Sequence, residues 1–191
     1  MSTIVDNPAE DINLRIAARV RGERAVRRWS LDELAERARV SRAMISKIER
    51  AEVSPTAALL GKLSGAYGIT LSALLADPEE RRGPLRRADQ PIWRDPATGY
   101  VRRQVSASAS IPVELTEVDL PPGAAVSFPA SSYAFISQVM WVLSGRLSFV
   151  EEDVTHELGP GDSYELGAPV ARTFRNDGAE PCRYLVVVLR K

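Results

Sequence analysis

Proline placement divides this 191-residue chain into two unlike halves. Only Pro8 and Pro55 lie in the first 77 residues, whereas the other eleven prolines follow. Because proline lacks a backbone N–H and interrupts helices, helices fit the first half, and short strands joined by turns fit the second. We therefore expect an all-α domain at residues 10–77 and an all-β domain at residues 92–191. A charged linker at residues 78–91 would join them.

The net charge of zero hides a similar division. Residues 1–88 carry 16 Lys and Arg against 12 Asp and Glu, whereas residues 89–191 carry nine against 13. Only the first domain is therefore suited to a polyanion such as DNA. The N-terminus lacks the basic start and apolar stretch of a signal peptide, and the longest apolar run, residues 184–189, is only six residues long. The sequence thus predicts a cytoplasmic protein without a membrane span, and its single cysteine, Cys182, excludes an internal disulfide.

Four or five short helices are expected in the first domain. The first has one apolar face, formed by Ile12, Ile16 and Val20. Ser30 and Glu33 have the spacing of a capping box, which opens the second helix. Ser41 can cap a third helix, residues 54–56 open a fourth, and residues 71–75 form a short last one.

The third predicted helix is basic on its outer side and apolar on its inner side. Ile45 and Ile48 share the inner side. The residues turned elsewhere are Arg42, Ala43, Ser46, Lys47 and Arg50. This helix is therefore the candidate for contacting a polyanion.

The run from Ser30 to Arg50, followed by residues 54–56 and 71–75, resembles the helix-turn-helix of the XRE (Cro/phage-repressor) family. The family spacing is matched by the pairs Leu34-Ala35, Val40-Ser41, Ile45-Ser46, Ile48-Glu49 and Pro55-Thr56. The chain departs from the family at Arg39 and Ala51, where glycine is usual. A left-handed backbone costs a residue other than glycine about 1 kcal/mol, so we expect mild strain at both positions.

The resemblance implies that the third helix enters the major groove of double-stranded operator DNA. The residues implied to contact DNA are Ser30, Ser41, Arg42, Ala43, Ser46, Lys47 and Arg50. Arg42 could span guanine O6 and N7, and Lys47 could reach a guanine or a phosphate, whereas Ser30, Ser41 and Arg50 suit phosphates. The alternative is that Arg42 and Lys47 are ordinary solvated charges on a fold used for protein contacts.

Short strands separated by turn residues predict a sandwich or barrel in the second half. Besides a strand that begins near Tyr100, they are expected at residues 113–120, 136–143, 146–150, 163–166, 170–175 and 184–189. In residues 113–120 the apolar positions slip from odd to even, which indicates either a bulge or a misplaced boundary. Arg102 and Arg103 point to opposite faces of their strand, so at most one of them faces the interior.

Glycine and proline positions in this half resemble the cupin superfamily over about residues 108–191. The matching segments are Pro122-Gly123, residues 142–145, residues 159–162, and Pro169 with residues 172–176. The resemblance implies a double-stranded β-helix barrel. Behind an XRE-like domain, it also implies a familiar architecture of transcriptional regulators, with the barrel as a sensor.

The ligands of metal-binding cupins are missing. Gln138 stands at the position of the glutamate, Arg172 stands at the position of the last histidine, and residues 131–134 contain no histidine. The only histidine, His156, fits an exposed strand end better than a ligand. We therefore predict no metal and no cofactor.

Strand alternation places polar side chains among the residues that face inward. Val170, Arg172 and Phe174 share one face, as do Ile136, Gln138, Met140 and Val142. A buried guanidinium needs acceptors, so Arg172 must bind an anionic ligand or pair with Glu165 or another protein carboxylate. The predicted ligand-binding residues are Gln138, Met140, Arg172 and Phe174. The expected ligand is a small metabolite, an amino acid or another carboxylate.

The function predicted from these patterns is that of a homodimeric, sequence-specific DNA-binding regulator whose metal-free barrel binds a small-molecule effector and modulates operator binding. Two-fold pairing would place the recognition helices about 34 Å apart on a pseudo-palindromic site. One alternative is a cupin-domain enzyme, an isomerase or oxygenase, with an autoregulatory DNA-binding domain, although the missing ligands favour a protein that is not an enzyme. Another is a cupin used only for dimerisation, which ligand-dependent melting would distinguish from a sensor.

Overall fold

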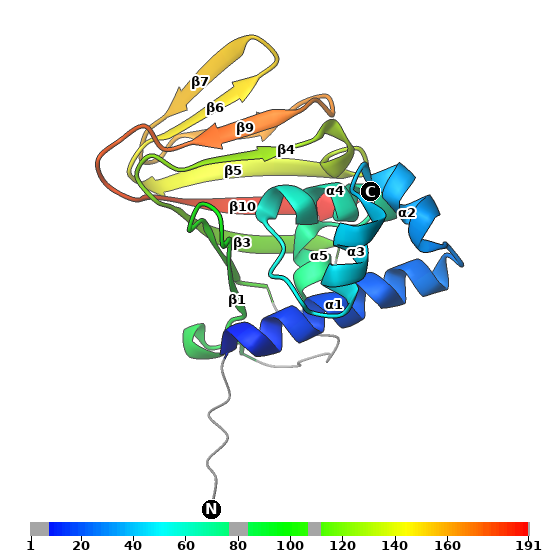
Figure 1. The fold of residues 1–191 in the computed structure, drawn as a ribbon. Coiled ribbons are helices and arrows are strands. Elements are labelled where there is room, and N and C mark those ends of the chain that lie inside the picture. The colour runs from blue at the N-terminus through cyan, green and yellow to red at the C-terminus, as the bar shows by residue number, and fades with distance from the viewer. Residues whose placement is uncertain (1–7, 77–83, 107–111, 191) are drawn as a thin grey trace, which may run out of the picture.

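The computed structural model describes residues 8–76, 84–106 and 112–190, and the side chains from residue 12 onward within them. A bundle of helices lies against one end of a β-barrel (Figure 1). The predicted order, a helical half followed by a strand-rich half, is confirmed. Residue 77 and the first part of the predicted linker, residues 78–83, lie outside the described residues.

The described residues form five α-helices, four of which begin at a side-chain cap. The helices are α1 (Pro8–Val26), α2 (Leu31–Ala38), α3 (Arg42–Glu49), α4 (Ala57–Tyr67) and α5 (Leu71–Leu75). The capping hydroxyls of α2 to α5 belong to Ser30, Ser41, Thr56 and Thr70. Each accepts a hydrogen bond from a backbone N–H in the first turn of its helix, and the capping box of Ser30 and Glu33 is complete. Local sequence therefore determines where these helices start.

The two departures from the glycine pattern take the backbone conformation that the sequence predicted. Arg39 has φ 52° and Ala51 has φ 57°, both in the left-handed region. Arg39 ends α2, where its N–H donates to the carbonyl of Ala35 or Glu36, and Ala51 follows α3. The turns survive without glycine because the helices on both sides hold them in place.

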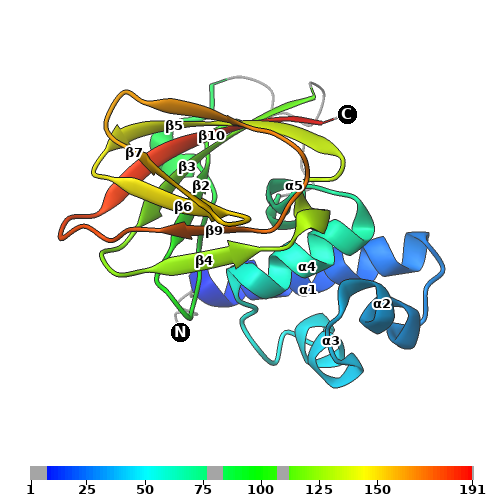
Figure 2. The ribbon, with the colours of Figure 1, turned by 90° about the horizontal axis from the view of Figure 1, so that it is seen from above.

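In the described part of the chain, ten strands form two sheets that face each other across the barrel interior (Figure 2). The six-stranded sheet has the order β1 (Ile92–Arg94), β2 (Val101–Gln104), β3 (Val113–Leu120), β10 (Cys182–Arg190), β5 (Ile136–Ser144) and β8 (Ser163–Leu166). The four-stranded sheet has the order β4 (Ala125–Phe128), β9 (Arg172–Arg175), β6 (Leu147–Glu151) and β7 (Val154–Leu158). All neighbours are antiparallel. The sequence patterns missed β4 and β7, which are short and belong to the smaller sheet.

Strand β3 contains no bulge. It pairs with β10 in unbroken register from Val113↔Leu189 to Leu120↔Cys182, and its even-numbered residues are buried. Two of those inward residues, Glu114 and Thr116, are polar, and this produces the apparent slip in the apolar pattern. The polar inward positions lie at the end of the strand that faces the helices.

The helical bundle packs directly on the barrel, with α4 against β4 and the 3-10 turn η2 (Ala130–Ser132). Ser132 Oγ donates to the carbonyl of Gly61 at 2.9 Å, and the N–H of Ala57 donates to Asp95 Oδ1 at 3.1 Å. Ser72 of α5 and Thr116 of β3 share a hydrogen bond of 3.0 Å between their hydroxyls. The contact between the two halves is therefore polar as well as apolar.

A second 3-10 turn, η1 (Arg87–Asp89), lies within the predicted linker and is tied to the barrel. Arg87 Nη2 lies 2.8 Å from Glu117 Oε1 of β3. This hydrogen-bonded ion pair lowers the pKa of Glu117 below its usual value. The part of the linker that follows residue 83 is thus held against the outside of the barrel.

Candidate DNA-binding surface and barrel cavity

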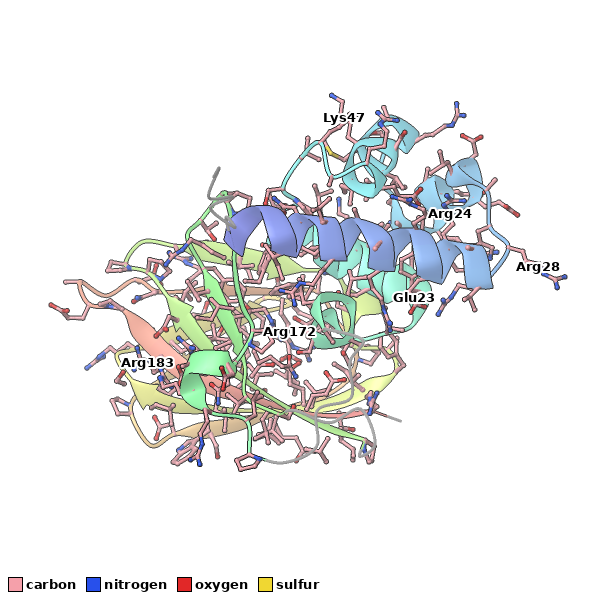
Figure 3. All side chains as sticks on the ribbon, turned by 90° about the horizontal axis from the view of Figure 1, so that it is seen from below. Glu23, Arg24, Arg28, Lys47, Arg172 and Arg183 are labelled. Atoms are coloured by element: carbon pink, nitrogen blue, oxygen red, sulfur yellow. The ribbon has the colours of Figure 1, made fainter. Side chains whose placement is uncertain are left out.

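Helix α3 projects from the bundle on the side away from the barrel, next to α2 (Figure 2). Figure 3 shows Lys47 at this outer edge, pointing away from the rest of the molecule. Ile45 and Ile48 are buried on the opposite side of the same helix. A surface that is free of the barrel is therefore available to a partner.

The predicted DNA-contacting residues lie together at this end of the bundle. The exposed ones are Ser30, Ser41, Arg42, Ala43, Lys47 and Arg50, and Ser46 is half-buried. The hydroxyls of Ser30 and Ser41 accept helix N–H groups at 3.1 and 3.2 Å, which leaves each hydroxyl hydrogen free to donate.

The three cations of α3 differ in their partners. Arg42 lies 3.4 Å from Asp32 in an exposed pair, and Lys47 forms no ion pair with a described residue. Arg50 donates to Glu52 at 2.5 Å and to Ser46 Oγ at 2.6 Å. Because Glu52 balances its charge, Arg50 is less available to a phosphate than Lys47.

A buried ion pair holds α3 on α1, and the sequence analysis did not anticipate it. Arg24 donates from Nε and Nη2 to the two carboxylate oxygens of Glu49 at 2.7 and 2.8 Å, and Arg21 Nη2 donates to the backbone carbonyl of Glu49 at 2.6 Å. Glu49 is only 7% exposed, and its hydrogen bond raises the pKa of Arg24. Figure 3 shows Arg24 directed from α1 toward the other helices. The one available signal was the polar Glu49 beside the apolar Ile48.

A cavity of about 50 Å³ with an open mouth lies where the barrel meets the bundle. Three of the four predicted ligand-binding residues, Gln138, Met140 and Phe174, line it. The fourth, Arg172, does not. Arg102 lines the cavity, whereas Arg103 of the same strand lies 3.5 Å from Glu117. This agrees with the expectation that at most one of these two arginines faces inward.

Arg172 is buried, as strand alternation predicted, but its guanidinium is occupied by protein acceptors. It donates from Nε and Nη2 to Glu151 at 3.0 and 2.9 Å, and to the carbonyls of Ala168 and Val170 at 2.9 and 3.3 Å. Its guanidinium carbon lies 4.7 Å from the ring centroid of Tyr133, and Figure 3 shows it among the barrel strands. The expectation that Arg172 holds a carboxylate ligand gives way to the structural ion pair, with Glu151 rather than Glu165 as the partner.

His156 lies in β7 rather than at an exposed strand end. Its ring stacks on Phe149 with the centroids 4.7 Å apart, and it lies 4.8 Å from the ring of Tyr164. Within the described residues, no three His, Cys, Asp or Glu side chains are grouped so that they could hold a metal ion. The histidine therefore serves the aromatic packing of the barrel.

No described helix has the length and apolar character that a membrane span requires.

Two family profiles match this chain. The Helix-turn-helix profile matches residues 23–74, and the Cupin domain profile matches residues 116–188. In agreement with its fold, the chain therefore consists of an XRE-type helix-turn-helix domain followed by a cupin domain.

Two relatives match this chain over most of their length. The HTH-type transcriptional regulator SutR of Escherichia coli (strain K12) is 25% identical over 161 residues, which cover 84% of this chain and 86% of SutR. The crystal structure of an HTH_3 family transcriptional regulator from Vibrio cholerae has a TM-score of 0.79 and 22% identity, and the match covers 96% of this chain and 99% of that one. Hydroxypropylphosphonic acid epoxidase from S. wedmorenis, with a TM-score of 0.45, 17% identity and coverage of 92% and 97%, is too dissimilar to carry an argument.

Proposed function

We propose that this protein is a transcriptional regulator of the cytoplasm that reads operator DNA with α3 and binds a small metabolite in its cupin barrel. The observation that carries the proposal is the exposed basic side of α3, which faces away from the barrel. Relatives that match most of this chain are named as transcriptional regulators. Residues 10–77 would bind DNA, residues 92–191 would bind the effector, and residues 78–91 would join them.

The contacts with DNA follow from the placement of the side chains. Arg42 would exchange its exposed contact with Asp32 for guanine O6 and N7, and Lys47 would reach a guanine or a phosphate. Ser30 and Ser41 would donate their free hydroxyl hydrogens to phosphates beside two helix N-termini. Ala43 is small enough to let the backbone approach a base edge, and Ser46 and Arg50 support each other at the end of the surface.

In a homodimer, two copies of the α3 surface would be related by a two-fold axis. The outer face of the six-stranded sheet has exposed apolar side chains on β5 at Val139, Trp141 and Leu143. Trp141 pairs across the sheet with Leu185, and Val139 pairs with Val187, so the apolar surface continues onto β10. A second copy of this chain, packed through the same face, would bury it and present two α3 helices to one operator.

The rival functions fit these side chains less well. A cupin enzyme of the metal-dependent kind needs histidine and carboxylate ligands, but Gln138 and Arg172 take two of those positions, and Glu151 occupies Arg172. A barrel used only for dimerisation has no need of an inward arginine in its cavity, and this chain has Arg102 there. We therefore place effector binding ahead of both alternatives.

The test is operator affinity measured by fluorescence anisotropy, on a site selected from random DNA by the wild-type protein. Arg42→Ala and Lys47→Ala should each weaken binding by about 1 to 3 kcal/mol without lowering the melting temperature, because both side chains are exposed. Arg42→Ala should also relax the sequence preference at one base pair. Loss of a contact to phosphate alone would weaken binding to all DNA sequences by the same factor.

Arg183→Ala is the matched control. Figure 3 shows this arginine at the far end of the barrel from Lys47, and its partner Asp119 is also on the barrel. This variant should bind the operator like the wild type. Wild-type affinity in both α3 variants would show that this surface contacts something other than DNA.

A further inference from the structure

The cavity is not enclosed by the barrel alone. Helix α4 contributes Gly61 and Ser64 to its wall, and the start of α5 contributes Leu71 and Ser72, together with Thr70 before it. The remaining lining residues come from the barrel. A molecule in this cavity would therefore touch both the sensor domain and the DNA-binding domain.

Arg102 is the only charged residue among the described residues that line the cavity, and no described carboxylate forms an ion pair with it. Its guanidinium donates to three neutral hydroxyls: Tyr100 at 2.9 Å, Ser72 at 3.1 Å and Thr116 at 3.4 Å. These hydroxyls accept hydrogen bonds but do not balance its charge. A partly buried cation in this state favours an anion as its partner.

Two other buried charged side chains of the barrel do not line the cavity. Arg172 is bound to Glu151, and Glu114 on β3 lies 3.6 Å from Arg190. Among the described residues that line the cavity, the charge without a carboxylate partner is therefore that of Arg102.

Tyr133 gives a second, independent indication of a ligand. This side chain lines the cavity and is only 8% exposed, but its hydroxyl has no hydrogen-bond partner. Burial raises the pKa of Tyr133 well above its usual value, so the hydroxyl stays protonated and can donate. A buried hydroxyl without a partner costs free energy that a ligand acceptor would recover.

We propose that this cavity binds a small organic carboxylate that pairs with Arg102, accepts a hydrogen bond from Tyr133 and contacts α5 of the DNA-binding domain. The proposal rests on the proposed function and assigns its effector site. Arg102 takes the ligand-binding role that was predicted from sequence for Arg172. The apolar side chains of Met140, Phe174 and Val188 suit the carbon body of an organic acid better than an inorganic oxyanion.

This placement explains how a ligand could change the DNA-binding domain. Ser72 of α5 shares a hydrogen bond with Thr116 and accepts one from Arg102, which also donates to Thr116. A carboxylate bound to Arg102 would therefore change the contacts that hold α5 on the barrel. Helix α5 packs on α1, and α1 holds α3 through Arg24 and Glu49. A ligand regulates only if it binds one arrangement of the bundle on the barrel more tightly than another.

The test is calorimetry and thermal melting of the full-length protein with a fixed panel of probes. The panel contains the proteinogenic amino acids, acetate, pyruvate, succinate and benzoate, with succinamide, benzamide, sulfate and inorganic phosphate as comparisons. We expect at least one carboxylate to bind and its matched amide to bind far more weakly. Arg102→Met should weaken that carboxylate by roughly 30-fold or more, because a desolvated charge pair is lost. Arg102→Lys should recover part of the affinity.

Two further variants separate a binding defect from a folding defect. Arg103→Met changes the neighbouring residue, which does not line the cavity, and should leave binding unchanged. Tyr133→Phe removes only a buried hydroxyl that has no partner, so it should not lower the melting temperature, and it should weaken carboxylate binding severalfold. If Arg102→Met fails to fold, Arg102→Lys and Tyr133→Phe still decide the outcome.

Three results would overturn the proposal: no carboxylate of the panel binds, binding survives Arg102→Met and Tyr133→Phe unchanged, or sulfate or phosphate binds more tightly than every carboxylate. Operator affinity is measured in parallel. If a neutral compound changes operator affinity equally in the wild type and in Arg102→Met, the proposed function stands and this site assignment fails. If a carboxylate binds through Arg102 without changing operator affinity, the site stands and regulation by the barrel fails.

Discussion

Two inward arginines show that the partner of a buried charge decides its role. Arg172 has a carboxylate, two backbone carbonyls and an aromatic ring around it, so the protein itself satisfies its guanidinium. Arg102 has only hydroxyls. Both residues lie on strands of one barrel and carry the same charge, but only Arg102 remains available to an anion.

The pairing of Arg172 predicts a stability defect on its removal. Arg172→Met should lower the free energy of unfolding by about 3 kcal/mol, because it leaves the charge of Glu151, with a side chain only 18% exposed, without its partner. The double variant Arg172→Met with Glu151→Leu should recover much of the loss. Urea denaturation of the four proteins in a double-mutant cycle measures both effects.

Arg175→Met is the control on the same strand, since Arg175 pairs with Asp177 on the surface at 47% and 53% exposure. This change should cost less than about 1 kcal/mol. An equally small loss for Arg172→Met would contradict the structural role given to it.

At the scale of elements, the contact between α4 and the barrel depends on the absence of side chains. A Cβ atom at Gly65 would lie 2.5 Å from Ser131 Oγ and 3.0 Å from the backbone carbonyl carbon of Ser131, and one at Gly61 would lie 2.7 Å from Phe128 Cδ1. Glycine inside a helix costs about 1 kcal/mol relative to alanine. Gly61 and Gly65 offset this cost because, without side chains at these positions, α4 lies close enough to the barrel to form one wall of the cavity.

Gly65→Ala should therefore lower the free energy of unfolding by about 1 to 3 kcal/mol, despite the higher helix propensity of alanine, because the new methyl group forces α4 away from η2. Chemical denaturation measures the change. Gly22→Ala is the matched control, since Gly22 is exposed in α1 and a Cβ there would meet no atom within 4 Å. That variant should be more stable than the wild type by up to about 1 kcal/mol. Equal effects of the two changes would rule out close packing at Gly65.

At the scale of the whole molecule, the barrel lies between two surfaces with different tasks. The helical bundle covers one end of it, with α3 turned outward, and the outer face of the six-stranded sheet is left with exposed apolar side chains (Figure 2). This division leaves the proposed DNA-binding surface and the proposed dimer surface free at the same time.

Trp141→Asp should convert the proposed dimer into monomers, because a charge replaces a tryptophan that is 47% exposed in the free chain and buried in the dimer. Sedimentation should show a dissociation constant raised roughly 30-fold or more, with a matching loss of operator affinity. Val154→Asp, at a residue 56% exposed on β7 of the other sheet, should leave the dimer intact. A wild-type protein that sediments as a monomer would refute the dimer directly.

The sequence by itself determined what depends on neighbours in the chain. The helix starts follow from Ser30, Ser41, Thr56 and Thr70, because each hydroxyl caps N–H groups only a few residues away. The outward side of α3 follows from the helical period. The left-handed turns at Arg39 and Ala51 were implied by the resemblance to the XRE family, in which glycine is usual at both positions. The inward position of Arg172 follows from strand alternation.

Only the tertiary structure decided which distant groups meet. Glu151 lies 21 residues from Arg172, and Glu49 lies 25 residues from Arg24, so no local period could pair them. The cavity wall combines residues from α4 and α5 with barrel strands that follow the linker, and the inward-facing Thr116 meets Ser72 of α5 beside it. Local propensity acts over a few residues, whereas the partner of a buried charge depends on how whole elements pack. For Arg102 that packing provides three hydroxyl partners and no carboxylate among the described residues.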